Sequence, residues 1–288
     1  MILYTRKDFV EWFRKAPKYR LLNVATPADD LVVPPRFISV CVTCMNRLSD
    51  LSQTLPKNIQ DNSDYPNAEF VLLDYNSTDG LEEWVHDTMR QHLDSGRLRY
   101  CHTEASRFCP NHSRNVSFRL AKGELITNVD ADNFTHPGFL SRLNQCASVA
   151  DRSLLIVPED FLLPNSNRLL LRGRFALYKK DIELLHGFDE TLDDGFSHDD
   201  VNFVFRMMMA QFQIVRFETR YVDGRIPTSD FDRRKNMRSD MSFEQMKVVN
   251  EYLTQLVLAR GRVTVNPFGW GKATVREVSG STQRWIQT

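Results

Sequence analysis

Residues 124–133 read ELITNVDADN, and this stretch decides the fold. Its apolar residues form a short run that is typical of a buried strand. The run ends in two carboxylates, Asp130 and Asp132, with one small residue between them. In an α/β sheet, ligands bind beyond the carboxyl ends of the strands. The sequence therefore predicts carboxylate oxygens at the place where a ligand would lie.

Carboxylate oxygens suit Mg²⁺ or Mn²⁺, and Mg²⁺ is usually held by one or two carboxylates plus substrate phosphates. We interpret Asp130 and Asp132 as a divalent-metal site for a nucleoside diphosphate. The pattern Asp-x-Asp alone is weak, because a second copy occurs at Asp230 and Asp232. That copy lies in a polar stretch without a preceding strand, which favours a solvated loop.

Strands and helices alternate over the first 135 residues, which predicts an α/β fold with a parallel sheet and right-handed crossovers. We expect strands at 37–43, 69–73, 97–101 and 124–129 and helices at 5–16, 50–58, 81–93 and 111–121. Farther along, we expect helices at 137–150, 180–185, 199–209 and 242–258 and strands at 153–157, 169–178 and 213–217.

Composition narrows the class of protein. The 288 residues carry 37 Lys and Arg against 37 Asp and Glu, which argues against a general nucleic-acid binder. We find no apolar stretch of about 18 residues that predicts a membrane span, and the charged start does not resemble a signal peptide. The five cysteines show no disulfide framework, so we expect the cytoplasm. Cys41 and Cys44 lie in a strand on opposite faces, as buried thiols rather than a metal or redox pair.

Anion binding must use residues other than a glycine-rich loop, because neither a dinucleotide-binding nor a Walker pattern occurs. Arg114 opens the helix before the carboxylate strand, and a helix N-terminus with a guanidinium is a good anion site. A surface arginine is the alternative. Asp74 ends the second strand, where it could accept a hydrogen bond from a uracil imide or a ribose hydroxyl. The alternative for Asp74 is an ordinary turn residue.

Residues 195–200, GFSHDD, open a later helix. Asp199 and Asp200 are ordinary residues for a helix N-terminus. They could equally deliver a general base into a cleft. His198 is either part of that site or a solvated loop histidine.

Together these segments resemble glycosyltransferase family 2. The resemblance lies in four ordered motifs between about residues 37 and 210: 43–47, 71–80, 113–133 and 187–206. It implies a GT-A (Rossmann-like) fold, with a mostly parallel central sheet flanked by helices and a smaller acceptor-side part. It also implies a metal-dependent, inverting enzyme that uses a nucleotide sugar, with UDP as the expected nucleotide and Mn²⁺ or Mg²⁺ as cofactor.

The resemblance also assigns residues. The nucleotide would be bound by Thr43, Asn46, Arg47, Asp74, Asn76, Ser77, Arg114 and Asp130, and the metal by Asp130 and Asp132. Asp200 would be the base, with Asp199 as the second choice, while His198 and Trp270 would lie on the donor or acceptor side. By chain position, we expect an N-terminal helix and arm at 1–36, a nucleotide-sugar-binding half at 37–135, an acceptor-binding half at 136–240, and a C-terminal helix and tail of the same domain at 241–288.

Three departures from the family pattern matter. Tyr75 stands where a second aspartate is common, and Asp199 stands where glutamate is commoner. Relatives of the galactosyltransferase type place a late histidine on the metal, but no histidine follows His198 in this sequence. That ligand is therefore missing, or Asp230 or Asp232 replaces it.

Two other functions remain open. A nucleotidyltransferase that makes a nucleotide sugar would favour a glycine-rich basic loop at 46–50, which reads NRLSD. A non-catalytic sugar-binding module would leave the carboxylates without a task. The acceptor (a glycan, lipid, protein or modified nucleic-acid base) and the oligomeric state stay open. We expect residues 224–240 to form a lid that orders around donor phosphates through Arg233, Arg234, Lys235 and Arg238.

Overall fold

The computed structural model describes residues 27, 31–149, 152–156, 175–222, 224–229, 232, 235–237, 240–279 and 282–288. The helix predicted at 5–16 and the first part of the strand predicted at 169–178 lie outside these residues.

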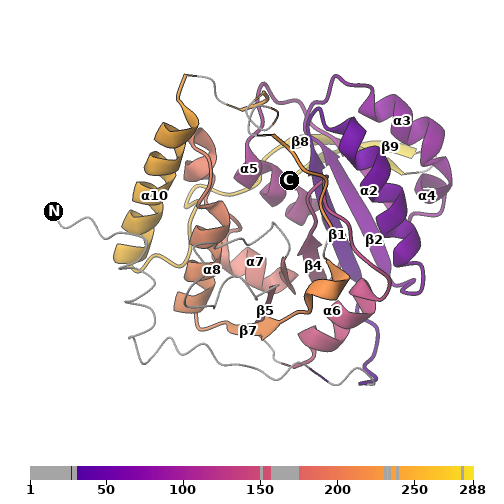
Figure 1. The fold of residues 1–288 in the computed structure, drawn as a ribbon, viewed down its shortest axis with the longest axis horizontal. Coiled ribbons are helices and arrows are strands. Elements are labelled where there is room, and N and C mark those ends of the chain that lie inside the picture. Colours follow the sequence, from indigo (N-terminus) through magenta and orange to yellow (C-terminus); the bar gives the residue numbers. More distant parts are fainter. Residues whose placement is uncertain are drawn as a thin grey trace.

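The described residues form one nine-stranded sheet in the order β7-β5-β6-β4-β1-β2-β3-β8-β9 (Figure 1). Its centre, β4-β1-β2-β3, is parallel, while β6, β8 and β9 pair antiparallel with their neighbours. The strands are β1 (Ile38–Cys44), β2 (Ala68–Asp74), β3 (Leu98–His102), β4 (Leu125–Asn128), β5 (Ser153–Ile156), β6 (Phe175–Tyr178), β7 (Gln213–Arg216), β8 (Thr274–Ser279) and β9 (Thr282–Gln287).

Helices cover both faces of the sheet, as the α/β pattern predicts (Figure 1). One face packs on α2 (Leu48–Asp61), α3 (Leu81–Thr88), α4 (Arg90–Asp94) and α6 (Phe139–Ala147). The other packs on α5 (Pro110–Leu120), α7 (Lys179–Leu185) and α8 (Asp199–Met209), with α10 (Phe243–Ala259) outside α8. Two 3₁₀ helices, η2 (Glu190–Asp194) and η3 (Thr219–Tyr221), complete the described elements.

The two cysteines of β1 show how the strand divides its side chains. Cys41 packs in the core on the α5 side and Cys44 in the core on the α2 side. Both thiols are buried and free, and burial raises their pKa far above the usual range. This confirms the prediction of buried thiols on opposite faces.

The carboxyl ends of the central strands meet at one edge of the sheet. In the parallel register, Cys44 lies opposite Asp74, and Cys41 lies opposite Asn128 of β4. The segment after β4 therefore leaves the sheet beside the loops that follow β1 and β2. This edge is where the sequence predicts the ligand.

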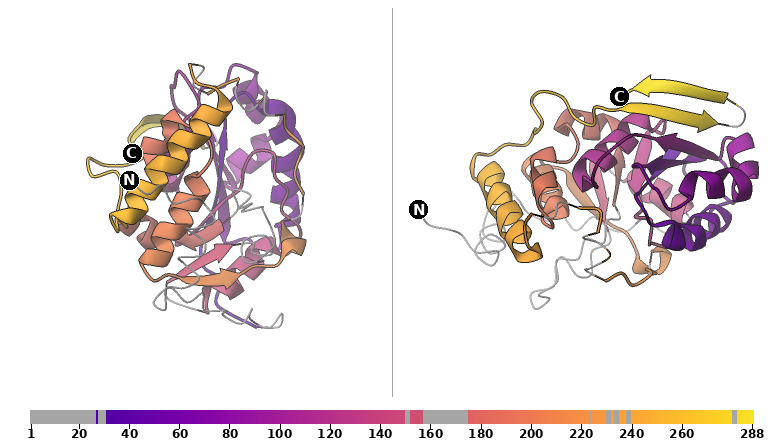
Figure 2. Two further views of the ribbon diagram at one scale, coloured as in Figure 1. Left: turned by 60° about the vertical axis from the view of Figure 1, so that its left-hand side comes forward. Right: turned by 90° about the horizontal axis from the view of Figure 1, so that it is seen from above.

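Two parts of the sequence prediction were wrong. The single helix expected at 81–93 is divided at the buried Met89 into α3 and α4. The hairpin β8–β9, which extends the sheet beyond β3, was not predicted (Figure 2). Val275 and Glu277 lie on the same face of β8, and both are buried. Because the second of these positions carries a charged residue, the sequence does not show the alternation of apolar and polar residues that predicts a strand.

Glu277 is buried because it joins an ionic network across β2, β3 and β8. Arg99 of β3 donates hydrogen bonds to Glu277 and, over 2.9 Å, to Glu69 of β2. Its guanidinium also donates to the carbonyl of Leu120 at 2.9 Å. Two buried carboxylates thus share one buried cation.

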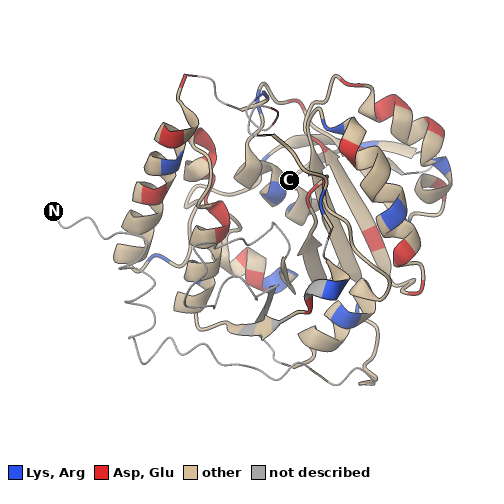
Figure 3. Cartoon of the chain, in the orientation of Figure 1, with Lys and Arg blue, Asp and Glu red and all other residues tan. Residues whose placement is uncertain are grey.

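Charges elsewhere are interspersed. Figure 3 shows Lys and Arg mixed with Asp and Glu on the helices in this view, in keeping with their equal counts. Within the described part of the chain, no helix is both long and apolar enough to cross a membrane.

We predict that Arg99→Met lowers the free energy of unfolding by about 3–5 kcal/mol, because it removes the buried cation that Glu69 and Glu277 share and leaves Glu277 paired with only the more exposed Arg284. Arg90→Met is the matched control, since it breaks an exposed pair with Asp94 and should cost less than about 1 kcal/mol. Urea unfolding of both variants measures the difference. If both variants lose the same free energy of unfolding, the burial of the Arg99 network does not increase its contribution to stability.

Candidate active site

A cavity of about 390 Å³ lies at the carboxyl edge of the sheet. Strand ends contribute Thr43, Asp130 and Asp132 to its wall, α5 contributes its fifth residue, Arg114, and α8 contributes its first two, Asp199 and Asp200. The loop 224–237 closes another side through Arg225, Asp232, Asn236 and Met237. The cavity thus brings together three of the predicted motifs from distant parts of the chain.

The Asp-x-Asp segment is held in place by helix α2. Thr54 donates a hydrogen bond to the carbonyl of Ala131 at 2.7 Å, and Asn58 donates to the carbonyl of Asn133 at 2.9 Å. Asp130 and Asp132 both line the cavity, and burial together with the Asp130 charge raises the pKa of Asp132. These two hydrogen bonds hold the backbone on either side of Asp132, and so position the Asp-x-Asp segment in the absence of a ligand.

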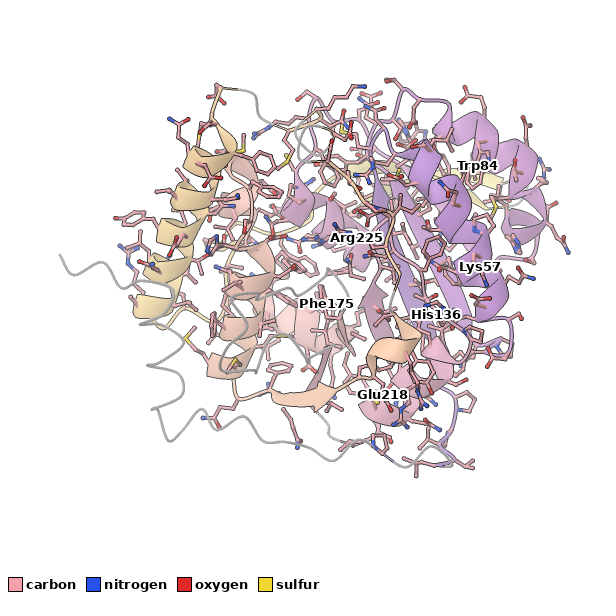
Figure 4. All side chains as sticks on the ribbon, viewed as in Figure 1. Lys57, Trp84, His136, Phe175, Glu218 and Arg225 are labelled. Carbon is pink, nitrogen blue, oxygen red and sulfur yellow. The ribbon has the colours of Figure 1, made fainter. Side chains whose placement is uncertain are left out.

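Two arginines approach Asp132. Arg47 Nη2 lies 3.6 Å and Arg225 Nε 3.9 Å from its Oδ2. Arg225 belongs to a segment that runs antiparallel along 132–136, where the amide of Ile226 donates to the carbonyl of Asp132 at 2.8 Å. Arg47 is also tied to this segment, through a 2.7 Å hydrogen bond to Thr228. Figure 4 shows Arg225 near the centre of the molecule, between the part that carries α8 and the part that carries β1.

Arg114 joins the two acidic segments. Its guanidinium donates a hydrogen bond to Asp199, lies 3.5 Å from Asp130, and lies 3.9 Å from Asp200. These charges hold the pKa of the buried arginine above its usual value despite burial. The guanidinium of Arg114 therefore lies between Asp130, which follows β4, and the two aspartates that begin α8.

An aromatic stack supports the guanidinium. The Arg114 Cζ lies 5.2 Å from the ring centroid of Phe188, and Phe188 stacks on Phe203 of α8 with 4.2 Å between centroids. Asn115 clamps Phe188 by accepting from its amide at 2.7 Å and donating to its carbonyl at 2.9 Å. A Cβ on Gly187 would lie 2.2 Å from Asn115 Oδ1, so the close approach requires glycine there.

Asp200 has a different environment from Asp199. It lines the cavity, and among the described residues no donor reaches its Oδ1 within hydrogen-bonding distance. Burial raises its pKa well above the ordinary value, and the neighbouring Asp199 charge adds to the effect. Asp199 is occupied by Arg114, whereas the Oδ1 of Asp200 is buried and has no hydrogen-bond donor among the described residues.

The metal hypothesis rests on Asp130 and Asp132 alone. Among the described residues, no group of three or more His, Cys, Asp or Glu side chains is arranged to hold a metal ion. Asp232 lines the same cavity but its carboxylate accepts from Ser229, and Asp230 lies outside the described residues. Two hard carboxylates fit Mg²⁺ or Mn²⁺ bound chiefly through substrate phosphates and water.

Several predicted nucleotide residues serve the loops around the cavity and are not among its lining residues. Asp74 accepts from Tyr100 at 2.6 Å and from the amide of Ser77 at 2.7 Å, and these bonds together with His102 lower its pKa despite burial. Asn46 is likewise engaged, donating to Asn236 at 2.9 Å and accepting from the amide of Thr78.

Two further predicted nucleotide residues and the tail also stand apart from the lining. Asn76 donates to the carbonyl of Ala105 at 2.7 Å, and Ser77 accepts from the amide of Asn46. Trp270 is buried, with Arg119 over its ring at 5.5 Å. Thr43, Arg47 and His198, in contrast, line the cavity as the sequence predicts.

The lining includes residues that sequence reasoning missed. Arg225 was hidden because it lies in a polar loop without a motif, and its contact partner Asp132 lies far away in the sequence. Met45, Phe108, Phe196 and Met237 supply an apolar wall. Aromatic and sulfur side chains are ordinary in sequence, so only the tertiary structure identifies them as site residues.

The expected lid is described at 224–229, 232 and 235–237. Asn236 donates to the carbonyl of Met45 at 3.1 Å, and its own carbonyl accepts from Phe108. The segment therefore lies across the end of β1. Its ordering by a donor stays a prediction, and Arg233, Arg234 and Arg238 lie outside the described residues.

Comparison with solved structures identifies the class of fold. The structure superposes on the mannosyltransferase PcManGT from Pyrobaculum calidifontis, in complex with GDP-Man and Mn²⁺, with a TM-score of 0.58 and 20% identity over 87% of this chain and 77% of that one. A fragment of S. aureus TarS in complex with UDP-GlcNAc gives 0.54 and 17% identity over 78% and 71%. The fold is GT-A, as predicted, with a sheet that is mostly parallel at its core.

The sequence comparisons add a family resemblance. Residues 39–161 match the family model Glycosyl transferase family 2, which confirms the predicted resemblance. A Campylobacter jejuni GalNAc(5)-diNAcBac-PP-undecaprenol beta-1,3-glucosyltransferase is 32% identical over 38% of this chain and 34% of its own length. The Pasteurella multocida hyaluronan synthase is 31% identical over 35% and 10%. The chain thus aligns with about a third or less of these curated relatives.

The raised pKa of the partly buried Asp200 predicts a pH-dependent stability difference. Its folded-state pKa is raised, so stability falls as pH rises from the unfolded value of 3.8 through the folded value. We expect Asp200→Asn to be more stable than the parent chain at pH 7 and this gain to vanish toward pH 4. Thermal unfolding across that range measures it, with the exposed Asp94→Asn as control. If the stability gain of Asp200→Asn does not change with pH, it does not come from the ionisation of Asp200.

Proposed function

We propose that this chain transfers a sugar from a nucleoside-diphosphate sugar, with UDP as the preferred nucleotide, to an acceptor hydroxyl with inversion at the sugar carbon. The proposal is supported by the family match at 39–161 and by relatives named as a glucosyltransferase and a hyaluronan synthase. Neighbours in the same fold are described with GDP-Man and UDP-GlcNAc.

One observation carries the proposal: the Asp-x-Asp carboxylates and the helix carboxylates share a single cavity. Asp130 and Asp200 lie within 3.5 and 3.9 Å of the same guanidinium, that of Arg114. A displacement at the sugar carbon needs a leaving diphosphate on one side and an accepted proton on the other. In this cavity, the Asp-x-Asp carboxylates serve the side of the leaving diphosphate, and Asp200 serves the side of the accepted proton.

On the donor side, Arg47 and Arg225 face the diphosphate. Both lie within 4 Å of Asp132, and guanidinium groups match phosphate oxygens in geometry and charge. A divalent cation at Asp130 and Asp132, when bound, supplies further neutralisation of the leaving diphosphate. The arginines hold Asp132 before binding and turn to phosphate oxygens afterwards.

On the acceptor side, Asp200 takes the proton of the attacking hydroxyl. Its raised pKa makes it a stronger base than an ordinary aspartate. Asp199, hydrogen-bonded to Arg114, orients the guanidinium. The apolar wall of Phe108, Phe196 and Met237 restricts water around the reacting groups.

The five free cysteines favour a reducing compartment, and we assign the protein to the cytoplasm on this ground.

Donor binding tests the Asp-x-Asp site. We expect Asp132→Ala to lose Mn²⁺-dependent UDP binding in calorimetric titrations. Arg225→Met should weaken UDP binding about tenfold, because one charge-assisted contact is lost. Asp94→Ala, a substitution on the outside of α4, is the control. Unchanged affinity of Asp132→Ala would remove the metal site from this position.

Turnover tests the base. With the parent chain, a panel of UDP- and GDP-sugars identifies the donor through release of the nucleoside diphosphate. We then expect Asp200→Asn to keep donor affinity within a few-fold but to lose at least about 10²-fold in turnover. NMR of the product should show an inverted anomer. Retention of configuration would contradict single displacement, and pyrophosphate release from a nucleoside triphosphate and a sugar phosphate would instead indicate a nucleotidyltransferase.

A further inference from the structure

The turn that carries the two acids is backbone-strained. Ser197 and His198 both adopt left-handed conformations, with φ of 70° and 67°, directly before Asp199 begins α8. Residues other than glycine rarely adopt such conformations, and they persist only where surrounding contacts enforce them. Two consecutive strained residues beside a cavity therefore require a restraint.

The restraint comes from α10, on the side of α8 away from the sheet. Asn250 is 1% exposed, and its amide donates to the carbonyl of Leu192 at 3.0 Å and to the carbonyl of Ser197 at 2.8 Å. Leu192 lies in η2 and Ser197 lies just before α8, so the two carbonyls flank the loop that joins η2 to α8. One side chain thus closes the loop at both ends.

The loop is shaped to receive this side chain. A Cβ added to Gly195 would lie 2.1 Å from Asn250 Oδ1 and 2.5 Å from its Cγ, so the glycine lets the amide approach the backbone. The next residue, Phe196, packs on Phe243 at the start of α10, with 4.1 Å between ring centroids. The loop thus fits against α10 at two consecutive residues, Gly195 against Asn250 and Phe196 against Phe243.

We propose that Asn250 is the positioning residue that fixes the loop 195–198 against η2 and thereby presents Asp199 and Asp200 to the cavity. The role of those acids in sugar transfer rests on the proposed function; the restraint of the loop does not. Asn250 lies outside the residues that match the family model, which end at 161. The acids are therefore positioned by a part of the chain beyond the matched segment.

The test compares three variants. Asn250→Asp keeps the shape but replaces the donating amide with an acceptor that repels both carbonyls. Gly195→Ala excludes the amide from the loop without altering α10. Thr254→Val is the matched control: Thr254 lies one turn farther along α10, equally buried, and its hydroxyl finds no partner among the described residues.

Hydrogen exchange decides the proposal independently of activity. Amides in 195–202 should exchange at least about tenfold faster in Asn250→Asp and Gly195→Ala than in the parent chain and Thr254→Val, because the loop opens once two hydrogen bonds are lost. Equal exchange in folded variants would overturn the proposal.

Kinetics then connect the loop to the reaction. Once a donor is known, we expect the first two variants to lose about 10–10²-fold in kcat while the Kd for donor changes less than about threefold, because displacement of a reacting group lowers the chemical step rather than donor binding. Faster exchange with unchanged kcat would overturn the positioning role. If the two variants exchange faster but the parent chain uses no donor, the proposed function is contradicted and the restraint of the loop by Asn250 stands.

Discussion

The guanidinium of Arg114 is the interaction on which the site depends. Without it, Asp130, Asp199 and Asp200 would place like charges around one buried point, which the low dielectric of the interior would not tolerate. The cation is itself held by the Phe188–Phe203 stack. The apolar core therefore fixes the position of the charge, and the charge fixes the acids.

This dependence explains why the parts of the site lie so far apart in sequence. Asp130 follows a sheet strand, whereas Asp199 begins a helix on the other half of the domain. Arg114 stands between them on α5, which packs against both β1 and η2. The pairing of β4 with β6 and the shared apolar core join these two segments, and α5 carries the charged side chain that contacts the acids of both.

The sequence was informative where function coincides with local structure. The strand that precedes Asp130 and the helix that begins at Asp199 both follow from periodicity and capping, and both were predicted. Arg114 was predicted as an anion site, but its carboxylate partners could not be foreseen, because they depend on how α8 packs against α5. Side-chain partners across a fold are not encoded in the spacing of a segment.

The same reasoning accounts for what was missed. Arg225 contacts Asp132 from a loop without periodicity, and β8 was hidden by the buried charge of Glu277. Asp74 was placed correctly at the end of β2, yet its oxygens are taken by Tyr100 and Ser77. Local sequence patterns predict the strand, helix or loop in which a residue lies. Long-range packing decides which other side chains it contacts.

The hairpin's place in the sheet has a consequence for how the chain folds. Arg99 and its partner Glu277 are 178 residues apart, so β3 gains its outer neighbour only after a very large loop has closed. Until then, the outer edge of β3 presents unpaired backbone groups to other chains. The vulnerable moment for aggregation is therefore late in folding or synthesis, when the parallel centre of the sheet is formed but its border is still open.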